Sequence, residues 1–166
     1  MKQVLVIAYG NPLRSDDGIA FQAAEALRRK LCNQVRVTCV HQLTPELAED
    51  VALADMVIFL DASSNAEPGR VACRAIFASP GESDFSHHFA PAEILDLCRR
   101  LYFAEPRAFL VSISGKSFRH GQELSPAVLH AVPEVVAQVS KLIEHLRRES
   151  RTPYHPRLAP GATSVL

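Results

Sequence analysis

Short, continuous apolar runs alternate along the chain with segments whose apolar residues return every three or four positions. The runs predict buried strands, and the periodic segments predict amphipathic helices. We expect strands at 3–9, 35–40, 56–60, 70–77 and 108–113, and helices that begin near residues 16, 44, 91 and 125. Strands that alternate with helices favour a mainly parallel sheet. The predicted fold is therefore a three-layer α/β sandwich, in which a twisted sheet of about five strands is flanked by helices on both faces.

The length of the chain, 166 residues, is enough for one domain with a sizeable core. We expect residues 1–149 to form this single α/β domain. Residues 150–166 contain three prolines and one glycine and show no apolar periodicity. That composition is typical of a flexible C-terminal tail.

The charge balance narrows the choice of partner, because Lys and Arg together number 18, as do Asp and Glu. Proteins that bind nucleic acid or anionic membranes usually carry a basic excess, so we expect neither partner. The first apolar run, 4–8, is too short for a signal peptide or a membrane-spanning helix. The cysteines have apolar neighbours and no C-x-x-C spacing, which favours a cytoplasmic protein with reduced cysteines in its core: Cys32, Cys39, Cys73 and Cys98.

Acidic residues follow two of the predicted strands at the point where each strand ends. Asp16 and Asp17 stand in the turn after the first strand, and Asp61 comes directly after Leu60. In open α/β sheets, ligands bind at the carboxyl ends of the strands. Each acid also has a structural alternative, since Asp16 and Asp17 can cap a helix and Asp61 can make hydrogen bonds within a turn. The local sequence leaves both possibilities open.

Two adjacent histidines, His87 and His88, lie in a polar segment before the helix expected at residue 91. Because neighbouring side chains point in different directions, at most one of them would join a given site. Two carboxylates and one imidazole suit an open site for a divalent metal such as Zn²⁺ or Ni²⁺. The sequence has no dinucleotide fingerprint, phosphate-binding loop or G-x-S-x-G motif, so we expect no organic cofactor. His41 and His120 are expected on loops or strand ends, without a role.

Four segments, taken in order along the chain, together resemble one family. They read Y-G-N-P-L-R-S-D-D-G-I-A at 9–20, A-D-M-V-I-F-L-D-A at 54–62, S-H-H-F at 86–89 and G-Q-E-L-S-P at 121–126. In these segments the chain resembles the maturation endopeptidases that trim the large subunit of [NiFe] hydrogenases. The resemblance extends over about residues 3–146 and leaves only the expected tail outside.

The resemblance implies a set of site residues. Members of the family bind a metal through an acid in the first turn, an acid that ends a later strand and a histidine in the following loop. Carried over, these ligands are Asp17, Asp61 and His87, and the two aspartates would also take part in catalysis. The first acid is often glutamate in the family, so the shorter Asp17 would hold a metal nearer the backbone. Asp16 and His88 remain rival positions, and we interpret Asp16 as a helix cap.

The resemblance also implies the reaction and the partner. Family members remove a short C-terminal peptide from the large-subunit precursor after nickel has entered it, so the nickel would be supplied by the substrate. We expect the three ligands to engage that nickel and orient the scissile bond. An ionised carboxylate or a metal-bound water would then activate the attacking water. We expect the protein to act as a monomer.

Two other functions would use the same residues. A non-catalytic nickel-binding maturation chaperone would inspect the precursor through the same three ligands. A small-molecule hydrolase would use Asp17 and Asp61 as an acid/base pair and would not need nickel.

Overall fold

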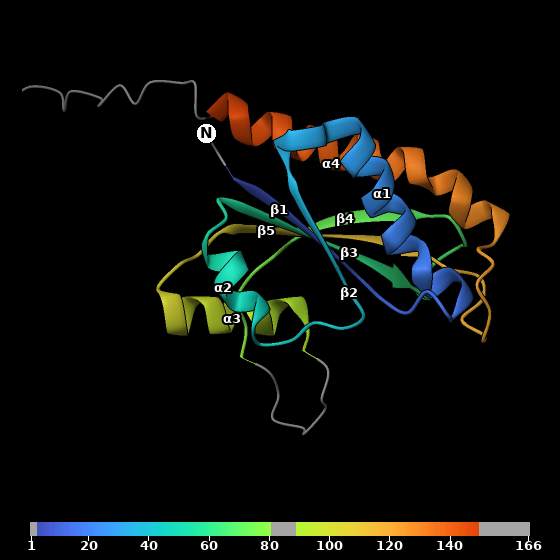
Figure 1. Ribbon diagram of the computed structural model, residues 1–166, viewed down its shortest axis with the longest axis horizontal. Helices are drawn as coiled ribbons and strands as arrows, with labels where there is room; N and C mark the ends of the chain where they lie inside the picture. Colours follow the sequence, from blue (N-terminus) through green and yellow to red (C-terminus); the bar gives the residue numbers. More distant parts are fainter. Residues whose placement is uncertain (1–2, 81–88, 150–166) are drawn as a thin grey trace, which may run out of the picture.

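A five-stranded sheet forms the centre of the protein in the computed structural model, which describes residues 3–80 and 89–149 (Figure 1). The strands are β1 (Val4–Tyr9), β2 (Arg36–Val40), β3 (Met56–Ser63), β4 (Val71–Ile76) and β5 (Arg107–Ser114). The helices are α1 (Ile19–Leu31), α2 (Leu47–Ala52), α3 (Pro91–Tyr102) and α4 (Pro126–Glu149), with the short 3₁₀ helices η1 (Ser15–Gly18) and η2 (Cys32–Gln34). Each strand and helix expected from the sequence is present.

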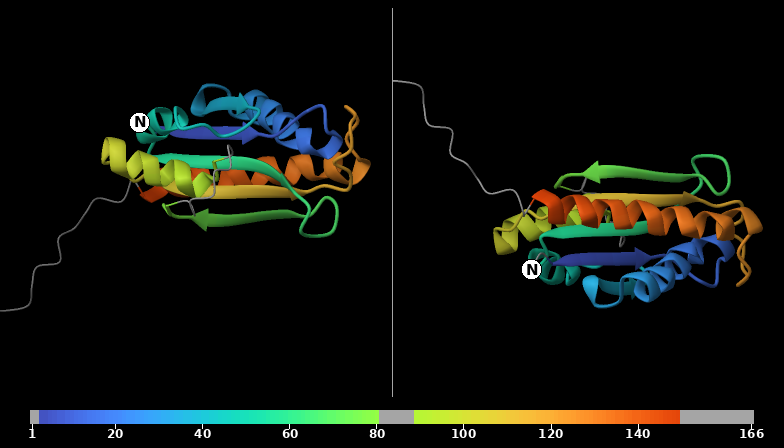
Figure 2. Two further views of the ribbon diagram at one scale, coloured as in Figure 1. Left: turned by 90° about the horizontal axis from the view of Figure 1, so that it is seen from below. Right: turned by 90° about the horizontal axis from the view of Figure 1, so that it is seen from above.

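The strands lie in the order β2–β1–β3–β5–β4. The first four of these run parallel to one another, and β4 runs antiparallel to β5 at the edge of the sheet (Figure 2). Residues 4–8 and 56–60 are each at most 3% exposed, as suits central strands that are covered on both faces. The predicted mainly parallel sheet is confirmed.

Helices cover both faces of the sheet. α1 and α4 pack on one face, and α2 and α3 pack on the other (Figure 1). Because side chains alternate along a strand, β1 sends Val6 toward α1 and α4, and Ile7 toward α2 and α3. The arrangement is the predicted three-layer α/β sandwich.

β3 continues beyond the end that the sequence predicted at Leu60. Its register with β5 pairs Asp61 with Ser112 and Ser63 with Ser114, which keeps the backbone extended. Asp61 therefore lies inside the strand, near its carboxyl end, and the structural alternative of a turn residue for Asp61 is wrong.

The cysteines differ from the expectation that all four lie in the core. Cys98 is buried and Cys39 is partly buried, but Cys32 and Cys73 are exposed. Cys32 follows the last turn of α1, and Cys73 lies in β4, which has a neighbouring strand on one side only. An apolar sequence context therefore did not ensure burial.

Among residues 3–80 and 89–149, no helix has the length and apolar character that a bilayer crossing requires. The tail expected at 150–166 lies outside the described residues.

Candidate functional site

Tyr9 and Asp61 meet at the carboxyl end of the sheet. β1 ends at Tyr9, and its neighbour β3 carries Asp61 two residues after Phe59, so that both side chains point to the α2/α3 face. The Tyr9 hydroxyl donates a hydrogen bond of 2.9 Å to Oδ2 of Asp61. The sequence analysis missed Tyr9, although its place at the end of a strand beside β3 was the one available signal.

A tight turn brings Asp17 to the same place. Gly10 has φ = 141°, a conformation that residues with a Cβ rarely adopt. A Cβ on Gly10 would lie 2.3 Å from the backbone oxygen of Asp17 and 3.6 Å from its carboxyl carbon. Oδ2 of Asp17 accepts the N–H of Asn11 at 2.8 Å, and Oδ1 of Asn11 accepts the N–H of Leu13 at 2.9 Å. Asn11 thus holds the turn, as its residue type favours.

Asp16 points the other way and is fully buried. Its Oδ2 accepts the backbone N–H groups of Lys116 and Ser117, at 2.7 and 2.9 Å. Ser125 donates its N–H to Oδ1 and its hydroxyl to Oδ2. Burial alone would raise the pKa of Asp16, but these hydrogen bonds outweigh it and hold the pKa below its ordinary value.

The interpretation of Asp16 as a cap of its own helix is wrong, because neither η1 nor α1 has a side-chain cap. Its carboxylate instead ties the first turn to the segment before α4, some 100 residues away in the sequence. With its acceptor positions filled and no exposed surface, Asp16 has no capacity for a further ligand. Of the two adjacent acids, Asp17 is the one that remains available to the site.

The 115–125 loop forms one wall of the site, and sequence analysis did not foresee this. The N–H of Ser15 donates to the Gly121 carbonyl at 2.8 Å, and the N–H of Gly121 donates to the Leu13 carbonyl at 2.9 Å. Phe118 of this loop lines a small hollow together with Asp61 and the polar residues Ser63, Ser64 and Asn65. The first turn is therefore clamped from outside, which fixes the position of the acids that it carries.

Burial and a neighbouring charge make Asp61 an unusual carboxylate. Removal from water raises its pKa, the Tyr9 hydrogen bond partly offsets this, and the negative charge of Asp17 raises it again, to about 6. Burial and the Asp61 carboxylate also hold the pKa of Tyr9 well above its ordinary value, so the phenol stays a neutral donor. Asp17 is near enough to act electrostatically on Asp61, so the two carboxylates together attract a cation or a proton. Perturbed pairs of this kind are typical of functional sites.

The third predicted ligand, His87, and its rival His88 lie outside the described residues. Among the described residues, 3–80 and 89–149, no cluster of three His, Cys, Asp or Glu side chains has the geometry to hold a metal ion. The chain re-enters the described part at Phe89, which packs against the core on the α2/α3 face. That is the face to which Asp61 points.

The other two histidines considered from the sequence are on loops, as expected. Nδ1 of His120 lies 3.1 Å from the Leu13 carbonyl, and His41 contacts the ring of Phe21 edge-on.

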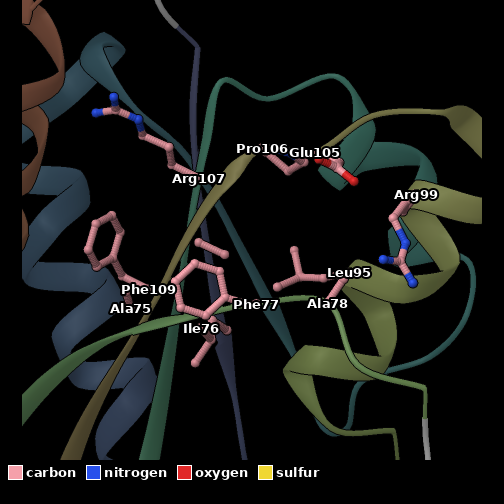
Figure 3. Close-up of a pocket in the computed structure, with 11 residues that line it drawn as sticks. Ala75, Ile76, Phe77, Ala78, Leu95, Arg99, Glu105, Pro106, Arg107 and Phe109 are labelled. Carbon is pink, nitrogen blue, oxygen red and sulfur yellow. The ribbon is translucent and has the colours of Figure 1, made fainter.

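A second hollow, larger and more apolar than the one beside Asp61, lies where β5 begins and the antiparallel β4 ends (Figure 3). Apolar side chains from the end of β4, from α3 and from the start of β5 surround it: Ile76, Phe77, Leu95 and Phe109. Its two arginines are engaged, since Arg99 pairs with Asp96 at 2.6 Å and Arg107 pairs with Glu149. Because the acidic pair stands at the other ends of the strands, this hollow is separate from the candidate site.

Comparison with known proteins relates this fold to a group of enzymes. No protein-family model and no curated protein matches the sequence. Solved structures do match: the hydrogenase maturating endopeptidase HybD from E. coli is 25% identical, with a TM-score of 0.69 over 90% of this chain and 94% of that one. The [NiFe] hydrogenase maturation protease HybD from Thermococcus kodakarensis is 28% identical, with a TM-score of 0.67 over 85% and 99%. The chain has the fold of a hydrogenase maturation endopeptidase.

A further solved structure, of an endopeptidase from Escherichia coli, is 25% identical and has a TM-score of 0.68 over 93% of this chain and 98% of that one. The resemblance identified from four sequence segments is therefore confirmed in three dimensions, and it extends over most of each chain. The similarity to named endopeptidases supports a protease.

Proposed function

We propose that this protein is an endopeptidase that removes a C-terminal peptide from the nickel-loaded large-subunit precursor of a [NiFe] hydrogenase. The observation that carries this proposal is the pair of Asp17 and Asp61 at the carboxyl end of the sheet, in a fold shared with maturation endopeptidases. Ligands of open α/β sheets bind at that end of the strands.

Nickel carried by the precursor is the recognition element in this proposal. Asp17, Asp61 and His87 bind it, since carboxylate and imidazole groups suit a borderline divalent ion. Within the described ion pairs, neither aspartate has a Lys or Arg partner. A divalent cation would relieve the repulsion between them and would be held by both charges.

The same carboxylates can drive hydrolysis of a peptide bond placed beside the nickel. Water attacks the carbonyl carbon, a base takes its proton, and the leaving amine gains a proton as the C–N bond breaks. Asp61 is our candidate for the base, since the Tyr9 hydrogen bond holds its carboxylate in place at the carboxyl end of the sheet. Asp17 holds the nickel and keeps the scissile bond in position.

The setting of the reaction follows from the same residues. We place it in the cytoplasm, because Cys32 and Cys73 are exposed free thiols, and exposed thiols persist in a reducing compartment. We expect one copy to be sufficient, since the three proposed ligands belong to a single chain.

The test is a time course of precursor processing. Nickel-loaded precursor is incubated with the wild-type protein, Asp17→Asn, Asp61→Asn or the control Asp50→Asn, and the intact mass of the precursor is measured. Asp50 is a suitable control because it lies on α2, away from the site. Its carboxylate forms an exposed ion pair with Arg36 of β2. We expect both site variants to lose processing and Asp50→Asn to keep it.

Two results would contradict the proposal. Full processing by Asp61→Asn would remove that residue from the reaction. Nickel-dependent binding of the precursor with no loss of mass under any condition would indicate a non-catalytic chaperone.

A further inference from the structure

Tyr9 is placed so that its ring reaches from one central strand to the carboxylate of the next. It is the last residue of β1, it packs against the core under the α2/α3 face, and its hydroxyl lies 2.9 Å from Oδ2 of Asp61. The two residues are 52 positions apart in the sequence. This is the one hydrogen bond from another side chain that the described residues supply to the Asp61 carboxylate.

The chemistry of the donor is well suited to orienting a ligand without neutralising it. A Lys or Arg in this place would pair with the carboxylate and reduce its attraction for a cation. The phenol is neutral, so it fixes the plane of the carboxylate and leaves the negative charge in place. Arg74 of β4 acts electrostatically on Tyr9, but it makes no ion pair with Asp61 within the described residues.

The hydrogen bond also makes the two carboxylate oxygens of Asp61 different, because Tyr9 donates to Oδ2. A carboxylate can accept at about four positions. Tyr9 occupies one on Oδ2, and the backbone N–H of Ala62 also donates to the group. These hydrogen bonds restrain the carboxylate, and they leave part of its acceptor capacity open.

On this basis we infer that Tyr9 is a positioning residue, which orients Asp61 toward the nickel of the precursor and so sets how strongly the protein prefers nickel-loaded over nickel-free precursor. The inference rests on the proposed function and assigns a role to a residue that does not itself touch the metal. Hydrogen-bond partners of metal ligands are in general worth about 10–100-fold in metal affinity or activity.

The experiment measures two dissociation constants on one protein preparation. The measurement is made on ice, so that cleavage is slow. It compares the binding of nickel-loaded precursor with that of nickel-free precursor to the immobilised protein. The ratio of the two constants is the preference for nickel. A partly unfolded preparation binds less of both precursors, so loss of active protein cancels in the ratio.

Tyr9→Phe keeps the ring and removes only the hydroxyl, and Tyr102→Phe is the matched control because Tyr102 is exposed on α3. We expect Tyr9→Phe to reduce the nickel preference by about 10–100-fold and Tyr102→Phe to leave it unchanged. The affinity for nickel-free precursor should stay the same in both variants. A general structural role for Tyr9 would instead weaken both affinities together.

A double-mutant cycle decides whether Tyr9 acts through Asp61. In the Asp61→Asn background, Tyr9→Phe should cause no further loss of nickel preference. If Tyr9→Phe has the wild-type preference, or if its effect is undiminished in the Asp61→Asn background, the inference is overturned while the proposed function stands. If the wild-type protein itself shows no preference for nickel, or if Asp61→Asn retains all of it, the proposed nickel recognition fails instead.

Discussion

Replacing Asp61 by asparagine should make the protein more stable at neutral pH while it removes processing. Burial and the charge of Asp17 raise the pKa of Asp61 from an ordinary 3.8 to about 6. The ionised carboxylate therefore destabilises the folded state. At about 1.4 kcal/mol for each pKa unit, the cost reaches about 3 kcal/mol once the pH is above 7. Asparagine has nearly the same shape and can still accept the Tyr9 hydrogen bond, but it carries no charge.

The sign of the pH dependence follows from proton binding. Between the unfolded and folded pKa values the folded state binds more protons at this site, so the stability of the wild-type protein falls as the pH rises through that window. The advantage of Asp61→Asn should be about 3 kcal/mol at pH 7.5 and about half as large at pH 5. Such gains at the expense of activity are common when an active-site charge is removed.

The assay is urea-induced unfolding followed by circular dichroism at pH 5 and at pH 7.5. Asp50→Asn is the control, because loss of its exposed ion pair with Arg36 should cost no more than about 1 kcal/mol at either pH. If Asp61→Asn is no more stable than the wild-type protein at pH 7.5, or if its advantage is equal at the two pH values, the account of a desolvated charge beside Asp17 is wrong.

Three further predictions concern the turn and the expected histidine. Asp16→Asn should lower the free energy of unfolding by about 3 kcal/mol in urea titrations, since an amide cannot accept all the hydrogen bonds that the buried carboxylate receives; a loss below about 0.5 kcal/mol would contradict the clamp. Gly10→Ala should cost about 1–2 kcal/mol through its positive φ and should slow precursor processing at least tenfold, because the new Cβ displaces Asp17; unchanged processing would show that the turn need not be tight. His87→Ala should reduce processing of nickel-loaded precursor by about 100-fold and His88→Ala by less than about twofold, and the reverse result would assign the ligand to His88.

The fold was accessible from the sequence because its two central strands are apolar on both faces. A strand covered on each side has that pattern, and two such strands separated by helices leave few alternatives to a parallel sheet. The burial that the sequence analysis expected for Cys73 was wrong. Its exposure depends on β4 being an edge strand, and the order of strands is set by contacts between distant segments.

The candidate site was predicted only in part. The carboxyl-end rule selected the turn after β1 and the end of β3, and it did so correctly for where Asp17 and Asp61 lie. It could not assign the role of Asp16, because the hydrogen-bond donors of that carboxylate come from residues 116–125, about 100 positions further along the sequence. Tyr9 escaped notice for a similar reason, since its partner is a side chain on another strand.

The central claim is that Asp17 and Asp61 belong to a peptidase that acts on nickel-loaded precursor. The most direct measurement is the intact mass of nickel-loaded and nickel-free large-subunit precursor after incubation with the wild-type protein. The account predicts that the nickel-loaded precursor loses its C-terminal peptide and that the nickel-free precursor keeps its full mass. Equal cleavage of both precursors would contradict nickel recognition, and cleavage of neither would contradict the peptidase activity itself.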